Sequence, residues 1–327
     1  MKSLYYFPSA SQKGYSNPYS IHYKRALESY FNVLEKNNAP AKALSWNFFK
    51  NSFTADVYIL NWLENAPFLR WGYLQFLLII FGLKVIQWRN KKVVWMFHNI
   101  HPHQGNNQLS KMIQDLLFKQ STFIISHSQE AAEYARQKTG NKVIYKCHPI
   151  SAIPVKPFNG EVKPCDVLIW GTILPYKGIY EFISDSNVQK ANLRIRIIGR
   201  CSDNELCKKI ESQCNNLISF ENRRIDFDEL AACIAQSRYV LFPYIGDCVS
   251  SSGALIDTIV LGGTPIGPHV GAFKDLEEEE VCLTYNQKGD LIELLKGDRS
   301  LNYDNVNRFI SNNSWKNFVS EINNEIN

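Results

Sequence analysis

The sequence of 327 residues contains eight cysteines, yet it has no C-x-x-C pair and no cysteine before Cys147. Cys201, Cys207 and Cys214 lie six and seven residues apart, a spacing that matches no common zinc site. This usage excludes a disulfide scaffold and is typical of reduced thiols in a cytosolic protein.

Patterns for secretion and for membrane spanning are also missing. Residues 1–10 contain one lysine and no long apolar run, which is not the pattern of a signal peptide. Residues 74–83 are nearly all apolar, interrupted only by Gln75 and Gly82. This run is shorter than the roughly 20 residues that a bilayer-spanning helix needs. We therefore expect a cytoplasmic protein.

The apolar run has basic and aromatic neighbours, which leaves two interpretations open. The basic residues are Arg70, Lys84, Arg89, Lys91 and Lys92, and the aromatic ones at its ends are Trp71, Tyr73 and Trp88. The run can form a helix buried in the core. It can also form a helix in a membrane surface, with its ends among the lipid headgroups.

Charge is distributed unevenly along the chain. Residues 1–158 contain 19 Lys and Arg against 7 Asp and Glu, whereas residues 159–327 contain 17 against 24. This asymmetry predicts two domains with different partners. An anionic substrate or an anionic membrane surface suits the basic half, and we expect no nucleic acid among the partners.

Short apolar runs alternate with amphipathic stretches, which predicts βαβ units and parallel sheets. The expected strands are 4–7, 57–60, 93–97, 123–126, 143–146, 167–170, 194–198, 218–220, 239–242 and 264–266. The expected helices are 20–37, 128–138, 178–184, 203–214, 226–235 and 253–261. A connection rich in proline, residues 150–164, predicts domains over 1–155 and 156–311.

A lysine follows the first expected strand of the second half. That strand ends at Gly171, and Lys177-Gly178 opens the next helix. Ligands of α/β folds bind at the carboxyl ends of strands, where a lysine can reach a phosphate. The P-loop pattern is absent, and an exposed loop lysine without a ligand remains the alternative.

A turn rich in serine follows the strand that ends near Pro243. The turn leads into a helix near Gly253, and Asp257 stands about one turn inside it. Amide groups at a helix start form an anion site, which here involves Ser251, Ser252, Gly253 and Ala254. Simple capping of the helix by serine is the alternative.

These segments together resemble the donor domain of GT-B glycosyltransferases, in particular the retaining enzymes of family 4. The segment from Gly171 to Gly178 is similar to the family's G-x5-K-G motif, whose lysine contacts the donor diphosphate. The resemblance implies that Arg200 lies near the phosphates and that Asp257 contacts the ribose. One position departs from the family's Glu-x7-Glu signature, because Val249 stands where the first acid is expected.

The first half resembles the acceptor domains of a subset of these enzymes, which add mannose or related sugars to lipid-linked intermediates. The similar segments are Asn17-Pro-Tyr19, residues 60–64 and residues 95–103. The resemblance implies an acceptor cleft that includes Asn17, Tyr19, Trp62 and Asn99, and a last helix, about 312–327, that packs back near the first domain. His98 and His127 each stand at the end of an expected strand, which indicates that both line the acceptor cleft and that His98 touches the donor sugar. A buried histidine with a structural hydrogen bond is the alternative for both. The spacing of His98, His101 and His103 gives no standard zinc geometry, so we expect no metal.

The resemblance implies an α/β protein of the GT-B fold, with two Rossmann-like domains whose parallel sheets face a cleft. It implies a metal-independent hexosyltransferase without a cofactor, which moves sugar from a UDP- or GDP-sugar to a glycan or lipid-linked hydroxyl in surface polysaccharide synthesis. Such an enzyme is cytoplasmic or peripheral on the inner face of the membrane.

The expected mechanism stabilises the leaving diphosphate through Lys177, Arg200 and the amides near Ser252. Retention is favoured, and inversion would need Glu64 or His98 as the base. A sugar-nucleotide 2-epimerase of the same fold and an inactive nucleotide-sugar-binding module are the alternatives.

Overall fold

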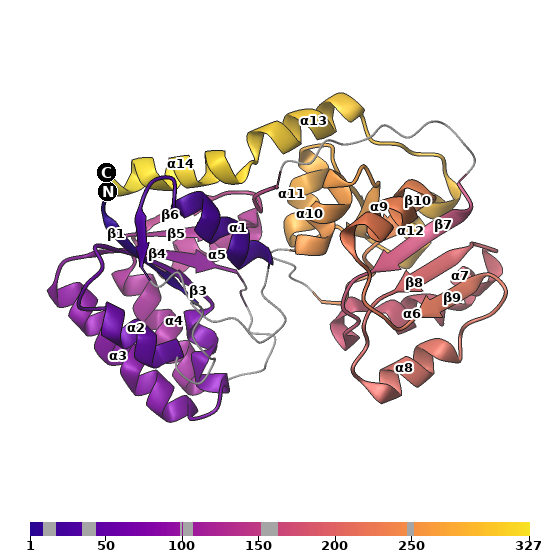
Figure 1. Ribbon diagram of the computed structural model, residues 1–327. Helices are drawn as coiled ribbons and strands as arrows, with labels where there is room; N and C mark the ends of the chain where they lie inside the picture. The colour runs from indigo at the N-terminus through magenta and orange to yellow at the C-terminus, as the bar shows by residue number, and fades with distance from the viewer. Residues whose placement is uncertain (9–17, 35–43, 99, 101–106, 152–162, 247–251) are drawn as a thin grey trace. The chain divides into compact units, whose positions relative to one another are not determined.

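A computed structural model of the chain describes residues 1–8, 18–34, 44–98, 100, 107–151, 163–246 and 252–327. The chain forms two compact units, which we call unit 1 (Met1–Pro149 with Asn313–Asn327) and unit 2 (Ile150–Asn312). Each unit has a sheet of six strands with helices on its faces (Figure 1). The expected boundary between residues 155 and 156 lies outside the described residues.

The sheet of unit 1 has the strand order β2-β1-β3-β4-β5-β6, and every neighbouring pair is parallel. The strands are β1 (Ser3–Phe7), β2 (Asn32–Leu34), β3 (Val57–Asn61), β4 (Lys92–Phe97), β5 (Phe123–Ser126) and β6 (Lys142–Tyr145). Side chains of a strand alternate between the two faces of a sheet. Trp95 accordingly lies in one core cluster, whereas Val94 and Met96 lie in the other.

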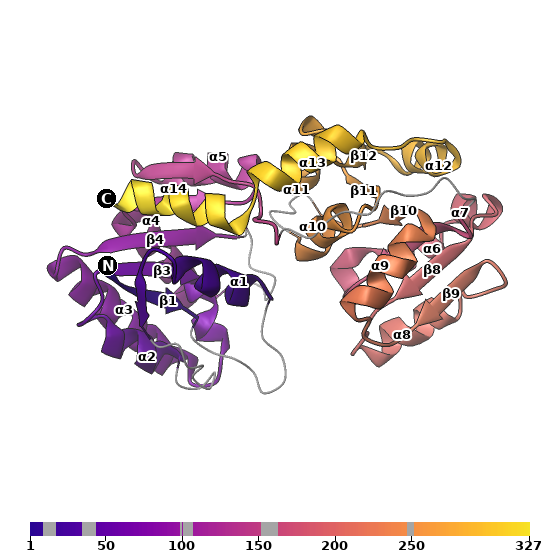
Figure 2. The same cartoon turned by 45° about the horizontal axis from the view of Figure 1, so that its top comes forward.

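Helices cover both faces of this sheet. The face that contains Trp95 packs against α2 (Leu44–Asn51), α3 (Gly72–Trp88), α4 (Gln108–Gln120) and α5 (Gln129–Lys138). The opposite face packs against α1 (Pro18–Leu27) and α14 (Trp315–Ile326) (Figure 1 and Figure 2). In the described part of the chain, no helix combines the length and apolar character needed to cross a bilayer.

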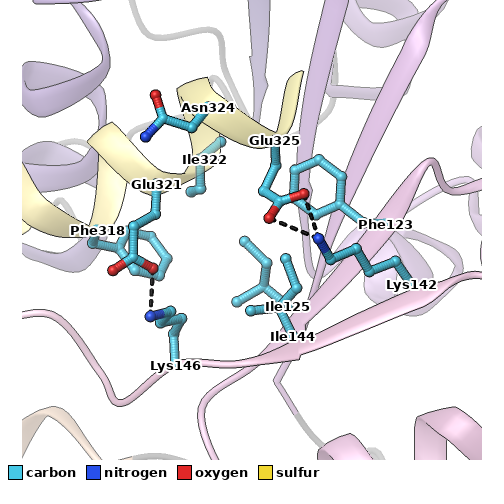
Figure 3. Close-up of a pocket in the computed structure, with 10 residues that line it drawn as sticks. All are labelled: Phe123, Ile125, Lys142, Ile144, Lys146, Phe318, Glu321, Ile322, Asn324 and Glu325. Atoms are coloured by element: carbon cyan, nitrogen blue, oxygen red, sulfur yellow. Dashed lines mark hydrogen bonds and ion pairs between the residues drawn. The ribbon is translucent and has the colours of Figure 1, made fainter. Parts of the chain in front are cut away.

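The C-terminal helix α14 contacts the sheet of unit 1 through apolar side chains and ion pairs. A hollow of about 380 Å³ lies between α14 and strands β5 and β6, and Figure 3 shows the residues that line it. Lys142 Nζ lies 2.7 and 2.6 Å from the carboxylate oxygens of Glu325, and Lys146 pairs with Glu321. The charged side chains at the hollow are thus paired with one another, and these ion pairs help to hold α14 against the edge of the sheet.

The sheet of unit 2 is also parallel, with the order β12-β11-β10-β7-β8-β9. The strands are β7 (Cys165–Trp170), β8 (Ile195–Ile198), β9 (Ile218–Glu221), β10 (Ser237–Leu241), β11 (Pro265–Pro268) and β12 (Leu283–Tyr285). The helices are α6 (Ile179–Ile183), α7 (Ser186–Lys190), α8 (Asn204–Glu211), α9 (Phe227–Ala235), α10 (Gly253–Val260), α11 (Gly271–Glu278), α12 (Lys288–Lys296) and α13 (Tyr303–Asn312). This order is the doubly wound arrangement of dinucleotide-binding domains.

Most expected elements are confirmed within a few residues, and one is wrong. The expected helix 20–37 ends at Leu27, and β2 follows as an edge strand beside β1. Phe31 and Val33 are buried whereas Asn32 is exposed, which is the alternation of a strand and not of a helix. Ser128 caps α5, since its Oγ accepts from the Ala131 amide at 3.2 Å.

Candidate functional site

The order of the strands in unit 2 reverses between β7 and β10. β8 and β9 lie on the far side of β7, whereas β11 and β12 lie on the far side of β10. Loops that leave two such strands diverge at their carboxyl ends and open a place where ligands bind. The loop after Trp170 and the start of α10 lie at this point of the fold and form the candidate site.

Glycines let two backbone segments approach closely at the end of β7. The Gly171 amide donates to the Ile198 carbonyl at 3.1 Å. A Cβ placed on Gly199 would lie 1.9 Å from the Gly171 oxygen, so no side chain fits at residue 199. Gly171 itself has φ +102°, a conformation that glycine adopts without strain.

The loop after β7 brings Lys177 back to the end of the strand. A Cβ on Gly171 would lie 3.5 Å from Lys177 Nζ and 3.9 Å from the Ala254 side chain. Gly178, with φ +64°, lets the chain pass the Pro243 carbonyl, which a Cβ would meet at 2.1 Å. Three sequence-predicted residues, Gly171, Lys177 and Ala254, therefore come together.

The electrostatic state of Lys177 is unusual for a lysine. Its side chain is buried, and its ammonium lies 5.5 Å from the centre of the Tyr244 ring. No carboxylate of the described residues forms an ion pair with it. Burial lowers the pKa of Lys177 to about 8. A buried ammonium without a counter-ion is costly, and an anionic ligand would remove that cost.

Helix α10 presents its N-terminus beside Lys177. Ser252 caps the helix, since its hydroxyl accepts from the Leu255 amide at 3.4 Å. Among the described residues, none accepts from the Gly253 or Ala254 amides, so the cap leaves donors for an anion. Ser251 lies outside the described residues.

Two further predicted donor residues have defined positions. Asp257 is half-buried on α10, and burial raises its pKa to about 6. Arg200 is exposed just beyond β8, and its carbonyl accepts from the Ile173 amide at 3.0 Å. Its backbone thus joins the loop that carries Lys177.

In unit 1, aromatic rings and imidazoles gather at the carboxyl ends of the strands. Trp62 follows β3, His98 follows β4 and His127 follows β5. The Tyr19 ring lies among them, with centroid distances of 5.8, 5.4 and 5.6 Å respectively. Trp62 stacks on His98 at 4.3 Å, so these predicted residues form one cluster.

Sequence reasoning missed a member of this cluster, His148, which lies shortly after β6. Its ring centroid lies 5.1 Å from that of Tyr19 and 5.4 Å from that of His127. The available signal was position, because three successive strands then end near a histidine. We call Tyr19, Trp62, His98, His127 and His148 the ring cluster. The predicted residues Asn17 and Asn99 lie outside the described residues.

Hydrogen bonds define the protonation of the buried histidines. Asn61 donates through Nδ2 to the Phe7 carbonyl at 3.0 Å, so its oxygen faces His98 Nε2 at 3.1 Å. His98 therefore carries its proton on Nε2 and keeps Nδ1 as an acceptor. Burial lowers the pKa of His98 well below its usual range and that of His127 to about 4. The imidazoles are thus neutral at pH 7.

Glu64 lies apart from the ring cluster. Its neighbours Leu63 and Ala66 belong to the core cluster that contains Trp95, beneath α2 to α4. The Glu64 side chain is buried, and burial raises its pKa to about 7. It forms no hydrogen bond with His98 or His127, the described histidines on the adjoining strands. The two candidate bases, Glu64 and His98, are therefore not linked by a hydrogen bond.

The described part of the chain contains no group of three His, Cys, Asp or Glu side chains placed to hold a metal ion. The sequence matches no protein-family model and no curated protein.

Comparison with solved structures finds chains of similar fold. Anabaena Alr3699/HepE in complex with UDP-glucose aligns over 98% of this chain and 99% of its own, with a TM-score of 0.68 and 12% identity. AviGT4, a glycosyltransferase involved in avilamycin A biosynthesis, aligns over 99% of this chain and 96% of its own, with a TM-score of 0.62 and 12% identity. The trehalose-6-phosphate synthase OtsA aligns over 100% and 96%, with a TM-score of 0.59 and 10% identity. The chain therefore has the GT-B fold, built from two Rossmann-like α/β domains.

Proposed function

We propose that this protein is a glycosyltransferase of family 4 type that uses a nucleoside-diphosphate sugar. The carrying observation is buried Lys177, without a described counter-ion, beside the uncapped amides of α10 at the switch point of a parallel sheet. Structures of the same fold hold UDP-glucose or UDP, which supports a UDP- or GDP-sugar as the donor.

In this mechanism, the protein stabilises the negative charge that develops on the diphosphate as the glycosidic bond breaks. Lys177, Arg200 and the amides of Gly253 and Ala254 supply the positive charge and the hydrogen bonds. The reaction is then independent of a metal ion and of any cofactor. Asp257 accepts hydrogen bonds from the ribose hydroxyls.

The ring cluster of unit 1 is the proposed acceptor region, together with Asn17 and Asn99. Aromatic faces and neutral imidazoles suit the apolar faces and hydroxyl groups of sugar rings. Retention is favoured, with the departing diphosphate taking the acceptor's proton. For inversion, His98 is the better-placed base than Glu64, because its Nδ1 remains an acceptor.

The acceptor is a glycan or lipid-linked intermediate of surface polysaccharide synthesis, with a hexose as the transferred sugar. We place the enzyme in the cytoplasm, peripheral on the inner face of the membrane. The basic character of unit 1, with 19 Lys and Arg against 9 Asp and Glu, supports an anionic acceptor and an anionic surface.

A panel of UDP, GDP, ADP and their sugars tests this proposal. We expect one diphosphate series to raise the melting temperature, and the matching sugar to be hydrolysed slowly without an acceptor. Conversion of the sugar nucleotide to an epimer would show a 2-epimerase. Binding without hydrolysis or transfer to any glycan or lipid-linked acceptor would show an inactive module, and no binding at all would overturn the proposal.

A further inference from the structure

Helix α3 is apolar on two opposite faces. Phe76, Ile79, Leu83 and Ile86 face the core of unit 1 and are almost fully buried. A helix at the surface of a globular domain normally carries polar residues on its other side. The outward face of α3 is therefore the feature to explain.

The outward face carries large apolar side chains in a regular row. Leu74, Phe81 and Trp88 are 53%, 57% and 83% exposed. They follow one another at intervals of seven residues, which places them on one side of the helix. Leu74 and Trp88 are two intervals of seven residues apart on α3, so the row extends over about 21 Å.

Neighbouring side chains widen this row into a patch. Trp71 and Tyr73 are exposed at the start of α3, and Trp46 and Phe53 are exposed on and just after α2. The two helices lie side by side on the same face of the sheet (Figure 1 and Figure 2). We call the seven exposed residues Trp46, Phe53, Trp71, Tyr73, Leu74, Phe81 and Trp88 the α2–α3 surface. Such a concentration of exposed apolar side chains marks an interaction site.

Charge around the α2–α3 surface identifies the partner. Residues 44–92 contain six basic residues and only two acidic ones, Asp56 and Glu64. Asp56 pairs with Lys91 at 2.8 Å, and Glu64 is buried. All of these residues are described, and no exposed acid among them is left unpaired. This charge balance would repel a basic protein partner and attracts an anionic one.

The combination of aromatic ends and basic flanks fits a bilayer surface. Trp71 and Trp88 bound the helix at its two ends, and tryptophan prefers the interface between lipid and water. Lys50 and Lys84 are exposed, and no described acid pairs with either. Each such residue contributes about 1 kcal/mol near an anionic membrane.

We propose that the α2–α3 surface docks unit 1 on an anionic lipid bilayer, with α3 lying in the plane of the interface. The biological role of this docking rests on the proposed function, since it brings the ring cluster's domain to a lipid-linked acceptor. Residues 74–83 then combine the two interpretations of the sequence. One face of the helix is buried in the core of unit 1, and the opposite face lies in the membrane surface.

Flotation with vesicles of phosphatidylcholine, with and without phosphatidylglycerol, tests the proposal. The variant Leu74→Gln/Phe81→Gln/Trp88→Gln removes the apolar row with residues that favour helices. We expect the parent protein to float with the anionic vesicles and the triple variant to float at least about tenfold less. Ile21→Gln, an exposed apolar residue on α1 across the sheet, is the control and should float like the parent.

A second pair of variants tests the electrostatic part. Lys50→Glu/Lys84→Glu should lower the partition coefficient about 30-fold or more, and rising salt should weaken binding of the parent. Arg25→Glu/Lys316→Glu makes the same change of net charge on α1 and α14 and should have a smaller effect. Arg89 is unsuitable, because it donates to the Ser52 and Ala55 carbonyls at 2.8 and 3.0 Å.

Two results would overturn the proposal. One is equal flotation of the parent and the triple variant with anionic vesicles. The other is a dimer in light scattering that the triple variant abolishes, with no flotation of the parent, which would make the patch a protein interface. Nucleotide binding, measured by thermal shift on the same samples, separates this outcome from failure of the proposed function. A variant that loses flotation and keeps nucleotide-induced stabilisation remains folded.

Discussion

The two units share a parallel sheet of six strands but place opposite kinds of chemistry at its carboxyl edge. Unit 2 has a buried lysine and, at the start of α10, the amides of Gly253 and Ala254, from which no described residue accepts. Unit 1 has a cluster of packed rings that belong to Tyr19, Trp62 and three histidines. The three histidines are neutral. The first arrangement suits the proposed diphosphate, and the second suits the proposed acceptor, which is uncharged at its hydroxyl groups.

Burial acts on both edges, with different results. In unit 1, burial removes the charge of His98 and His127, because their pKa values fall below the physiological range. In unit 2, burial lowers the pKa of Lys177 only to about 8, so most of the ammonium remains charged at pH 7. The same physical cost therefore produces a neutral site in one unit and a charged site in the other.

Loss of the Lys177 charge should have the largest effect. Lys177→Met keeps an unbranched side chain and removes the ammonium. We expect turnover to fall about 10²–10³-fold, because charge on the departing diphosphate loses its stabilisation. The melting temperature of the nucleotide-free protein should stay level or rise, since a buried charge without a counter-ion is removed.

The control is Lys190→Met, which changes an exposed lysine at the end of α7 in the same unit. It should leave turnover unaltered. Steady-state kinetics and differential scanning calorimetry give both quantities. Near-parental turnover in folded Lys177→Met would mean that the buried ammonium is structural, and the contrast between the units would lose its functional meaning.

Asp257 tests whether the nucleoside is held by the same helix as the diphosphate. Asp257→Ala should weaken nucleotide binding by roughly 1.5–3 kcal/mol, the value of a hydrogen bond to a charged group. Asp257→Glu should weaken it less, because a carboxylate is kept. Calorimetric titration with the nucleoside diphosphate measures both. Parental affinity in both variants would remove Asp257 from the ribose site.

The pH dependence of nucleotide binding should come from unit 2. The free Lys177 ammonium has a pKa of about 8, and a bound diphosphate favours its charged form. Affinity should therefore be highest between about pH 7 and pH 8, and it should fall by up to about tenfold per pH unit above pH 8. Titration calorimetry between pH 7 and pH 9 checks this, and Lys177→Arg should flatten the profile because arginine stays protonated.

Much of the fold could be predicted from the sequence because its strands are buried apolar runs bounded by turn residues. The expected strand 123–126 is reproduced as β5 without change. The short edge strands β2 and β12, of three residues each, escaped prediction. A three-residue run carries too little alternation to separate it from a helix or a loop, and only pairing with β1 or β11 fixes it as a strand.

Residues of the candidate site could be predicted where they stand directly at the end of a strand or at the start of a helix. Gly171, Lys177 and Ala254 belong to strand ends and helix starts, which sequence patterns mark. The Tyr244 ring beside Lys177 depends on packing between distant segments, and so does the hydrogen bond from His98 Nε2 to Asn61 Oδ1 that sets the His98 tautomer. His148 was missed because Lys146 and Cys147 separate it from its strand.

A hydrogen bond within the ring cluster should give the smallest effect, and it tests unit 1 alone. Tyr19 donates to His127 Nε2 at 2.9 Å, because His127 Nδ1 is committed to the Lys146 carbonyl at 2.8 Å. Tyr19→Phe leaves a buried ring nitrogen without this donor and should lower the free energy of unfolding by about 1–2 kcal/mol. The matched control is Tyr23→Phe, whose hydroxyl contacts only the Met96 sulfur at 3.7 Å among the hydrogen bonds of described residues, and it should cost less. Urea unfolding measures both free energies. Nucleotide affinity should stay unaltered in either variant, because the residues proposed to bind the diphosphate belong to unit 2. If Tyr19→Phe costs no more than Tyr23→Phe, the ring cluster is held by stacking rather than by its hydrogen bonds.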